Sequence, residues 1–331
     1  MRPLLIAALA AAFSTGATAQ SLNLANYQPS DSYALDRLVG QGGMGLEASA
    51  VTYARDRGTL FFVGDEGLGV VEVSRTGQTL GTMRFDWAGT GSTHNDTEGL
   101  TYLGDGRLVV VEERLQRAYR FDYTAGATVA LGSAPSATIS TWVPNNIGIE
   151  GISVDPRDGS FVTVKQDADG NAARGPQEVR AGALDFAVGG GTAGLPVLFD
   201  ANLLGLASLS DVQTLAGVDA LAGTAAADHL LILSLDSKRL VEATRSGQVV
   251  SWLDLSGLTA TQAIEGVTID ERGVIYLVAE QAQGSGAPAD AASRLFVLTP
   301  VPEPSSAALL AAGLAFAGWR VRRSSRTTGA N

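Results

Sequence analysis

One pattern of residues occurs twice in this chain, 115 positions apart. Residues 149–166 are IEGISVDPRDGSFVTVKQ and residues 264–281 are IEGVTIDERGVIYLVAEQ. Each copy places a glutamate before a glycine, then an apolar run rich in β-branched residues, a turn that contains Gly, and a second such run. Two runs of this kind joined by a short turn are typical of a β-hairpin. The sequence therefore predicts a hairpin that is used more than once.

The same opening, an acidic residue followed by small and apolar residues, occurs five times. The five openings are EASAVTY at Glu47, EGLTYLG at Glu98, EGISVDP at Glu150, DVQTLAG at Asp211 and EGVTIDE at Glu265. Their spacings are 51, 52, 61 and 54 residues, and two further strand-like runs follow most of the hairpins. Four strands in about 50 residues are typical of one propeller blade.

The fold class predicted is all-β, a single β-propeller of four-stranded blades over residues 20–299, with five blades. The last unit supplies only three strand-like runs, so we expect YALDRLV at residues 33–39 to close the ring as its outermost strand, which removes a free sheet edge. A sixth blade is the alternative, and it would lie in the long third unit, which contains AVGGGTAG.

Both ends of the chain have the composition of targeting segments. Residues 1–19 combine Arg2, an apolar stretch and the small-residue pattern Ala17-Thr18-Ala19, which predicts a secretory signal peptide. Near the other end, a Pro-Glu-Pro motif precedes an apolar stretch, predicted to be a membrane helix at about residues 306–319, and a tail rich in arginine. The motif residues are Pro302, Glu303 and Pro304.

In the order of these three parts, residues 300–331 resemble the PEP-CTERM sorting signal of Gram-negative bacteria. The resemblance implies processing by an exosortase and release to the cell surface or the exopolysaccharide matrix. Before release, the helix would hold the chain in the inner membrane with its basic tail in the cytoplasm. A permanent single-span anchor is the alternative, although the apolar run is shorter than the ~20 residues that a span usually needs.

Composition excludes several classes of site. A formal net charge of -11 argues against nucleic-acid binding, which needs clustered Lys and Arg. The chain contains no cysteine, so disulfides, thiolate metal sites and cysteine nucleophiles are excluded. Of its two histidines, His94 and His229, we expect both at the surface.

The repeated acids should gather at one end of the channel, because the first strand of each propeller blade lines it. A first ring is expected from Glu47, Glu98, Glu150, Asp211 and Glu265. Because the second strand returns to the same mouth, a second ring is expected from Asp65, Glu112, Lys165 and Glu280.

Carboxylates crowded together away from water take up protons or a cation. Oxygen ligands without cysteine favour Ca²⁺, or Mg²⁺, as the cofactor. Two alternatives remain open: the acids bind backbone N–H groups and lock blade to blade, or they serve as acids and bases in catalysis.

Several stretches resemble the SdiA-regulated family of bacterial β-propellers. They are DTEGLTYLGDGRLVVVEERLQRAYRF, IEGISV with VTVKQ, LLILSLDSKRLVEATRSGQVV and AIEGVTIDERGVIYLVAEQ, and the resemblance extends over about residues 46–298. It implies a propeller with a metal, calcium above all, near the channel mouth and no settled enzymatic activity. It is weakest in the fourth unit, which begins at Asp211.

The sequence favours an exported module that binds a divalent cation and acts in binding or interaction, with exopolysaccharide or surface components as partners. The alternative is a phytase-like, metal-dependent phosphoesterase or esterase, in which basic groups such as Lys165 and Arg114 would hold the phosphate. A third possibility is a purely structural matrix protein.

Overall fold

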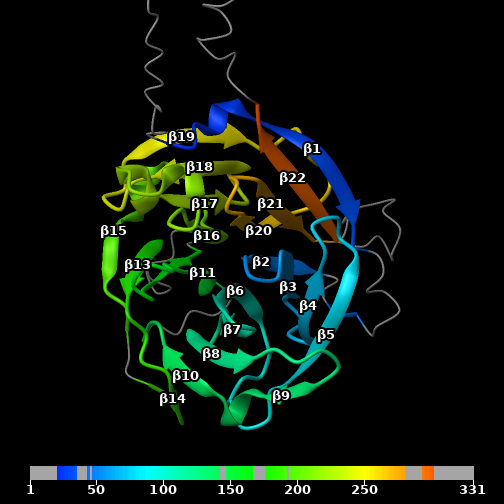
Figure 1. The fold of residues 1–331 in the computed structure, drawn as a ribbon. Helices are drawn as coiled ribbons and strands as arrows, with labels where there is room; N and C mark the ends of the chain where they lie inside the picture. The colour runs from blue at the N-terminus through cyan, green and yellow to red at the C-terminus, as the bar shows by residue number, and fades with distance from the viewer. Residues whose placement is uncertain are drawn as a thin grey trace, which may run out of the picture.

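The computed structural model is a five-bladed β-propeller, as the sequence predicted (Figure 1). It describes residues 21–35, 43–44, 47–141, 147–166, 176–191, 194–280 and 293–301. The five innermost strands, β2, β6, β11, β16 and β20, surround the centre of the ring, and the outer strands form its rim (Figure 1).

The four main strands of every blade pair antiparallel, and in blades 1 to 4 they follow one another in sequence from the channel outward. Short 3-10 helices join some of the strands. Blade 1 contains β2 (Ala48–Ala54), β3 (Thr59–Gly64), β4 (Gly69–Val73) and β5 (Thr79–Asp86). Blade 2 contains β6 (Thr97–Gly104), β7 (Arg107–Glu112), β8 (Arg117–Asp122) and β10 (Pro135–Thr138), with η3 (Leu131–Ser133) before β10. Blade 3 contains β11 (Ile149–Val154), β12 (Phe161–Lys165), β13 (Glu178–Gly182) and β15 (Val197–Asp200). Blade 4 contains β16 (Asp211–Thr214), β17 (Leu230–Ser234), β18 (Arg239–Ala243) and β19 (Val249–Asp254), with η5 (Ala201–Leu204), η6 (Asp219–Leu221) and η7 (Ala225–Asp228) in its connections. Blade 5 contains β20 (Ile264–Ile269), β21 (Ile275–Ala279) and β22 (Arg294–Pro300).

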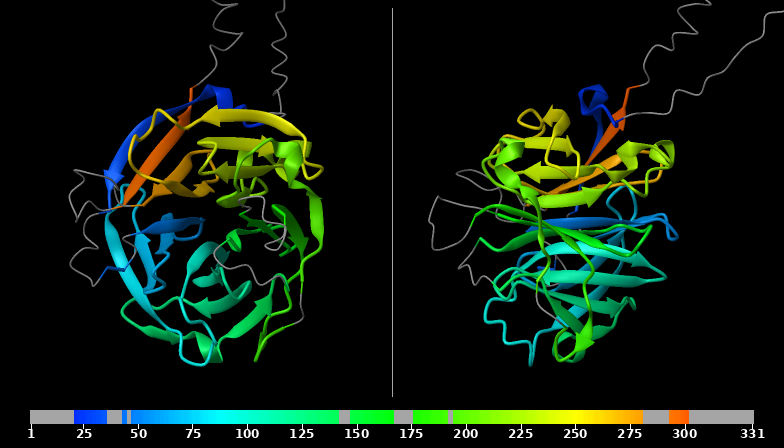
Figure 2. Two further views of the ribbon diagram at one scale, coloured as in Figure 1. Left: turned by 180° about the vertical axis from the view of Figure 1, so that it is seen from behind. Right: turned by 90° about the vertical axis from the view of Figure 1, so that its left-hand side faces the viewer.

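An N-terminal strand completes blade 5. After η1 (Leu24–Asn26), β1 (Tyr27–Ala34) pairs antiparallel with β22, so the two ends of the domain lie side by side (Figures 1 and 2). The closure was predicted, but the strand begins at Tyr27, six residues before the expected stretch 33–39. Tyr33 and Ala34 of that stretch belong to the strand, and residues 36–39 lie outside the described residues. Most residues of β1 are exposed, so its pairing follows from the backbone groups of β22 rather than from an apolar pattern.

Two short strands extend blades 1 and 2 beyond the predicted four. β9 (Thr128–Ala130) pairs in parallel with β5, and β14 (Ala187–Val188) pairs with β10. β14 belongs to the long third unit, so the extra length of that unit extends the sheet of blade 2 and forms no sixth blade.

The hydrophobic core is divided into five clusters, one between each pair of neighbouring blades. Their members include Leu233 and Leu277 between blades 4 and 5, Phe61 and Tyr119 between blades 1 and 2, and Phe62 and Tyr276 between blades 5 and 1. The two remaining clusters lie between blades 3 and 4 and between blades 2 and 3. Each blade therefore buries both of its faces against its neighbours.

Hydroxyl groups near the C-terminal ends of the inner strands join neighbouring blades. In four of the five junctions, a Thr or Ser oxygen accepts a hydrogen bond from a backbone N–H of the adjacent inner strand, at 3.0 or 3.1 Å. The acceptors are Thr52, Thr101, Ser153 and Thr268. The sequence analysis did not identify this hydroxyl set, although every unit carries Thr or Ser a few residues after its acid.

Candidate metal centre

The repeated glutamates sit on β-bulges at the start of the inner strands. In blades 2, 3 and 5 the register shifts around Glu98, Glu150 and Glu265, so each is an extra residue opposite its partner strand. A bulge leaves the extra residue unpaired and redirects its side chain, and bulges are common beside functional sites. In blade 1 the bulged residue is Ser49, and Glu47 lies two residues before it.

The glycine after each bulged glutamate allows the inner strands to approach closely at the channel. A Cβ atom on Gly151 would lie 2.5 Å from Asp211 Oδ1 and 2.6 Å from its Cα atom, and one on Gly266 would lie 2.9 Å from the Cα atom of Ala50. Both contacts are shorter than a carbon atom tolerates. In each repeated Glu-Gly pair, the bulge thus redirects the carboxylate of the glutamate, and the glycine lets the inner strands lie close together around the channel.

The bulged glutamates act on one another electrostatically across the mouth. Burial raises the pKa of Glu98 well above its usual range, and the charges of Glu150 and Glu265 raise it further. Burial also raises the pKa of Glu150, with the charges of Glu113 and Glu265. These side chains from three different blades are therefore close enough to repel one another in their charged forms.

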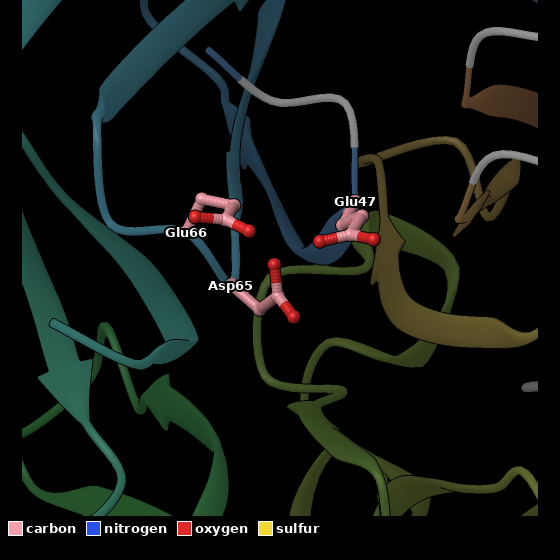
Figure 3. Close-up of side chains that lie close together, drawn as sticks. All are labelled: Glu47, Asp65 and Glu66. Carbon is pink, nitrogen blue, oxygen red and sulfur yellow. The ribbon is translucent and has the colours of Figure 1, made fainter. Parts of the chain in front are cut away.

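A second group of carboxylates gathers around Asp65, which follows β3. One oxygen each from Glu47, Asp65 and Glu66 lies within 4.8 Å of the others, and these side chains point toward one another (Figure 3). Asp65 forms a second such group with Asp96 and Glu98. Asp65 thus links the acids of blade 1 to those of blade 2.

The Asp65 carboxyl group shares a hydrogen bond with another acid, Glu47, which disfavours its charged form. Its Oδ1 atom is buried and has no hydrogen-bond partner among the described residues. Burial, together with the charges of Glu47, Asp96 and Glu66, raises the pKa of Asp65 to about 8. The charged form of Asp65 is therefore disfavoured here, and a proton or a cation would each relieve the repulsion.

Besides Glu66, two acids of this mouth were not part of the predicted rings. Asp96 precedes β6 and accepts a hydrogen bond from Arg114 Nε at 2.6 Å. Glu113 accepts one from the Gly148 backbone N–H at 2.6 Å, and burial raises its pKa to about 7 despite that bond. The tandem Glu112-Glu113 in the sequence was the only signal for the second of these.

The register of the hairpins corrects the predicted second ring. Gly64, Glu112, Lys165 and Ala279 pair with the residue before each bulge, so Asp65 and Glu280 lie one position farther along, in the same column as Glu113. Neighbouring positions on a strand face opposite ways. Glu112 and Lys165 therefore do not share a column with Asp65 and Glu280, as we had expected.

The side chains of Glu112 and Lys165 make local contacts with the protein. Glu112 Oε1 accepts a hydrogen bond from Ser92 Oγ at 2.5 Å, and its Oε2 accepts one from the Leu115 backbone N–H at 2.6 Å. Lys165 Nζ donates to the Pro176 carbonyl oxygen at 3.2 Å, and its side chain is fully buried.

Asp211 differs from the other repeated acids. Its strand has no bulge, and its two carboxylate oxygens accept hydrogen bonds from the backbone N–H groups of Val212, at 2.8 Å, and of Val267 in blade 5, at 2.7 Å. This is the blade-to-blade contact that the alternative interpretation of the repeated acids describes. Blade 4 is also the unit in which the sequence departs most from the repeat.

The two histidines lie in different environments. His94 is exposed, as expected. The prediction that His229 is at the surface was wrong: it is 9% exposed, and its Nδ1 atom lies 2.8 Å from Glu242 Oε1. Glu242 also accepts a hydrogen bond from the Leu22 backbone N–H, so this pair helps to anchor the N-terminal segment on blade 4.

The donor set at the mouth fits a hard divalent cation. Oxygens that bind one Ca²⁺ ion at 2.3–2.6 Å are at most about 5 Å apart, and the oxygens of each group around Asp65 lie within 4.8 Å of one another. The donors identified there are carboxylate oxygens, which suit Ca²⁺ or Mg²⁺ better than zinc.

Both predicted targeting segments lie outside the described residues. These segments are residues 1–19 and the sorting region with Pro302, Glu303, Pro304 and the helix at about 306–319. In the portion of the chain that the structure describes, we find no helix with the length and apolar character of a membrane span.

Two solved structures are similar to this chain at low sequence identity. A luciferin-regenerating enzyme is 11% identical with a TM-score of 0.47, over 82% of this chain and 95% of its own. The glutaminyl cyclase of Myxococcus xanthus is 13% identical with a TM-score of 0.47, over 83% of this chain and 97% of its own. Similarity at this level has no bearing on function.

Two family descriptions match the sequence itself. The PEP-CTERM protein-sorting motif matches residues 300–323, which confirms the predicted resemblance of that segment. The SdiA-regulated family matches residues 23–283, which contain every strand of the propeller except β22. The chain therefore belongs to the SdiA-regulated family of proteins.

Proposed function

We propose that this protein is an exported propeller that binds a divalent cation, Ca²⁺ in the first place, at its acidic mouth and acts as a binding or interaction module. Export follows from the PEP-CTERM motif at residues 300–323, with exosortase as the processing partner. The ligands that we assign to the cation come from Asp65, Asp96 and Glu98, with Glu150 and Glu265 completing the negative charge around it.

The observation that carries this proposal is the unpartnered, buried oxygen of Asp65 among acids from several blades. Burial and mutual repulsion favour the protonated forms of these acids. A bound cation would reverse that preference, because it stabilises the ionised carboxylates and releases their protons. Asp211 is left out of the ligand set, since its oxygens already accept two backbone hydrogen bonds.

A binding role is favoured over phosphoester hydrolysis. A hydrolase would need basic groups free to hold the phosphate beside the metal. Both candidates from the sequence are engaged by the protein: Arg114 lies beside the proposed cation site but is paired with Asp96, and Lys165 donates to the Pro176 carbonyl.

Thermal unfolding with and without cations tests the proposal. A ligand that binds only the folded state stabilises it by about 2.7 kcal/mol at 100 times its Kd. The melting temperature therefore rises with the concentration of the ligand. We expect such a rise with Ca²⁺, a smaller one with Mg²⁺, and reversal by a chelator. Glu150→Gln, which removes one charge from the mouth, should reduce the rise.

Asp254→Asn is the matched control, because Asp254 is an exposed carboxylate on the outer strand β19. This variant should respond to Ca²⁺ as the wild type does. Equal melting temperatures in Ca²⁺, Mg²⁺ and chelator would contradict the proposal. The alternative, that the acids bind backbone N–H groups and lock blade to blade, would then be favoured.

A further inference from the structure

The channel also opens at the end opposite the acids, where a cavity of about 860 Å³ is found. Its lining takes residues from the C-terminal ends of all five inner strands: Thr52, Tyr102, Val154, Gln213 and Thr268. The bulged acids lie at the N-terminal ends of the same strands, three or four residues from these lining residues, or roughly 10–13 Å at ~3.3 Å per residue. The volume is that of a site for a small molecule.

Two arginines of blade 2 line one side of this cavity. In the register of β7 and β8, Arg120 pairs with Val109 and Arg107 pairs with Asp122, so the two arginines are diagonal neighbours on one face of the sheet. Among the described residues, Arg120 has no carboxylate partner, and Arg107 has only a 3.5 Å contact with the exposed Asp105. With so few close ion pairs, the two guanidinium groups on this side of the cavity are available to bind an anion.

An aromatic side chain holds Arg120 in place without using its hydrogen-bond donors. Arg120 Cζ lies 5.1 Å from the centre of the Phe186 ring, which packs edge-on against Phe161 with centroids 5.8 Å apart. A guanidinium group stacked in this way keeps its N–H edge free to bind a carboxylate with two hydrogen bonds.

The floor and wall of the cavity offer donors and acceptors for a hydroxylated molecule. The hydroxyl groups of Thr52 and Thr101 each accept one backbone N–H at 3.1 Å, and within the described chain neither donates a hydrogen bond. Carboxylates of Asp56, Asp105 and Glu271 also line the cavity and can accept hydrogen bonds.

The geometry points to a second binding site at this end of the channel for a sugar ring that bears a carboxylate, a uronic acid. Its carboxylate would bind Arg107 and Arg120, its ring would lie against Phe186, and its hydroxyl groups would meet Thr52 and Thr101. This site is separate from the acidic mouth and does not depend on a cation there.

Calorimetric titration of the full chain with glucuronate, glucose and inorganic phosphate tests the site. We expect glucuronate to bind at least tenfold more tightly than glucose, which lacks the carboxylate, and than phosphate, which lacks the ring. Arg120→Gln should weaken glucuronate binding at least tenfold. Chelator and Glu150→Gln should leave it unchanged, which separates this result from that of the cation site.

Arg239→Gln is the matched control, because Arg239 stacks over Trp252 at 4.7 Å and lies outside the cavity lining. It should bind glucuronate as the wild type does. Absence of glucuronate binding, phosphate binding as tight as that of glucuronate, or equal losses in the Arg120 and Arg239 variants would each overturn the proposal.

Discussion

The stability of the cation-free protein should fall as the pH rises, and Glu113 shows why. Burial raises the pKa of this carboxyl group from 4.5 to about 7. The folded protein therefore holds a proton on Glu113 at pH values at which the unfolded chain has released it. The stability that results is present below pH 4.5 and is lost as the pH rises through about 7.

The size of the effect follows from the shift. Each pKa unit corresponds to 1.36 kcal/mol, so a rise from 4.5 to about 7 contributes about 3 kcal/mol between pH 4.5 and pH 8. Asp65 and Glu98, whose pKa values are also raised, change stability in the same direction. These acids share protons as a group, so their contributions are not additive.

Urea unfolding in chelator from pH 4.5 to pH 8 measures this slope. We expect the free energy of unfolding to fall by about 3 kcal/mol or more, and saturating Ca²⁺ to remove the fall. Glu113→Gln keeps an oxygen for the Gly148 N–H and should make the slope shallower. Asp254→Asn should not, because hydrogen bonds from Ser256 lower the pKa of this exposed group, which titrates below the pH range used. A flat or rising profile in chelator would refute the reasoning.

Two further predictions concern the contacts between blades. Asp211→Ala leaves two buried N–H groups, those of Val212 and Val267, without acceptors. It should lower the free energy of unfolding in urea by about 2–6 kcal/mol, while the Ca²⁺ affinity measured by calorimetry stays unchanged. A large loss of affinity would return Asp211 to the ligand set. Thr101→Val removes the acceptor of the Val154 N–H and should lower the free energy of unfolding by about 1–3 kcal/mol in the same urea assay. Thr101→Ser should lower it by less. Equal losses would show that the hydroxyl group does not stabilise this contact.

The sequence predicted the propeller because its information is local and repeated. Each hairpin carries its own β-branched runs and turn, and five copies leave few other folds. The start of the closing strand was predicted six residues too late, at Tyr33 and not at Tyr27, because an exposed outer strand needs only backbone pairing and shows no apolar alternation.

The sequence predicted which residues of the site are acidic, but not how their side chains are arranged in space. The sequence places an acid at the start of every inner strand, yet only the ladder shows that Glu98, Glu150 and Glu265 sit on bulges and that Asp211 does not. The ladder also pairs Glu112 with Thr97 as it pairs Gly64 with Ala48, which brings Glu113 rather than Glu112 into the column of Asp65. The pairing register of the strands decides which acids lie on bulges and which share a column. The sequence pattern does not specify that register.

A crystal structure of the protein grown with Ca²⁺, with anomalous scattering used to locate the ion, tests the cation site most directly. We predict an anomalous peak at the acidic mouth, 2.3–2.6 Å from carboxylate oxygens of Asp65, Asp96 and Glu98. A well-ordered mouth without such a peak, with these carboxyl groups bound to each other or to water, would contradict the account.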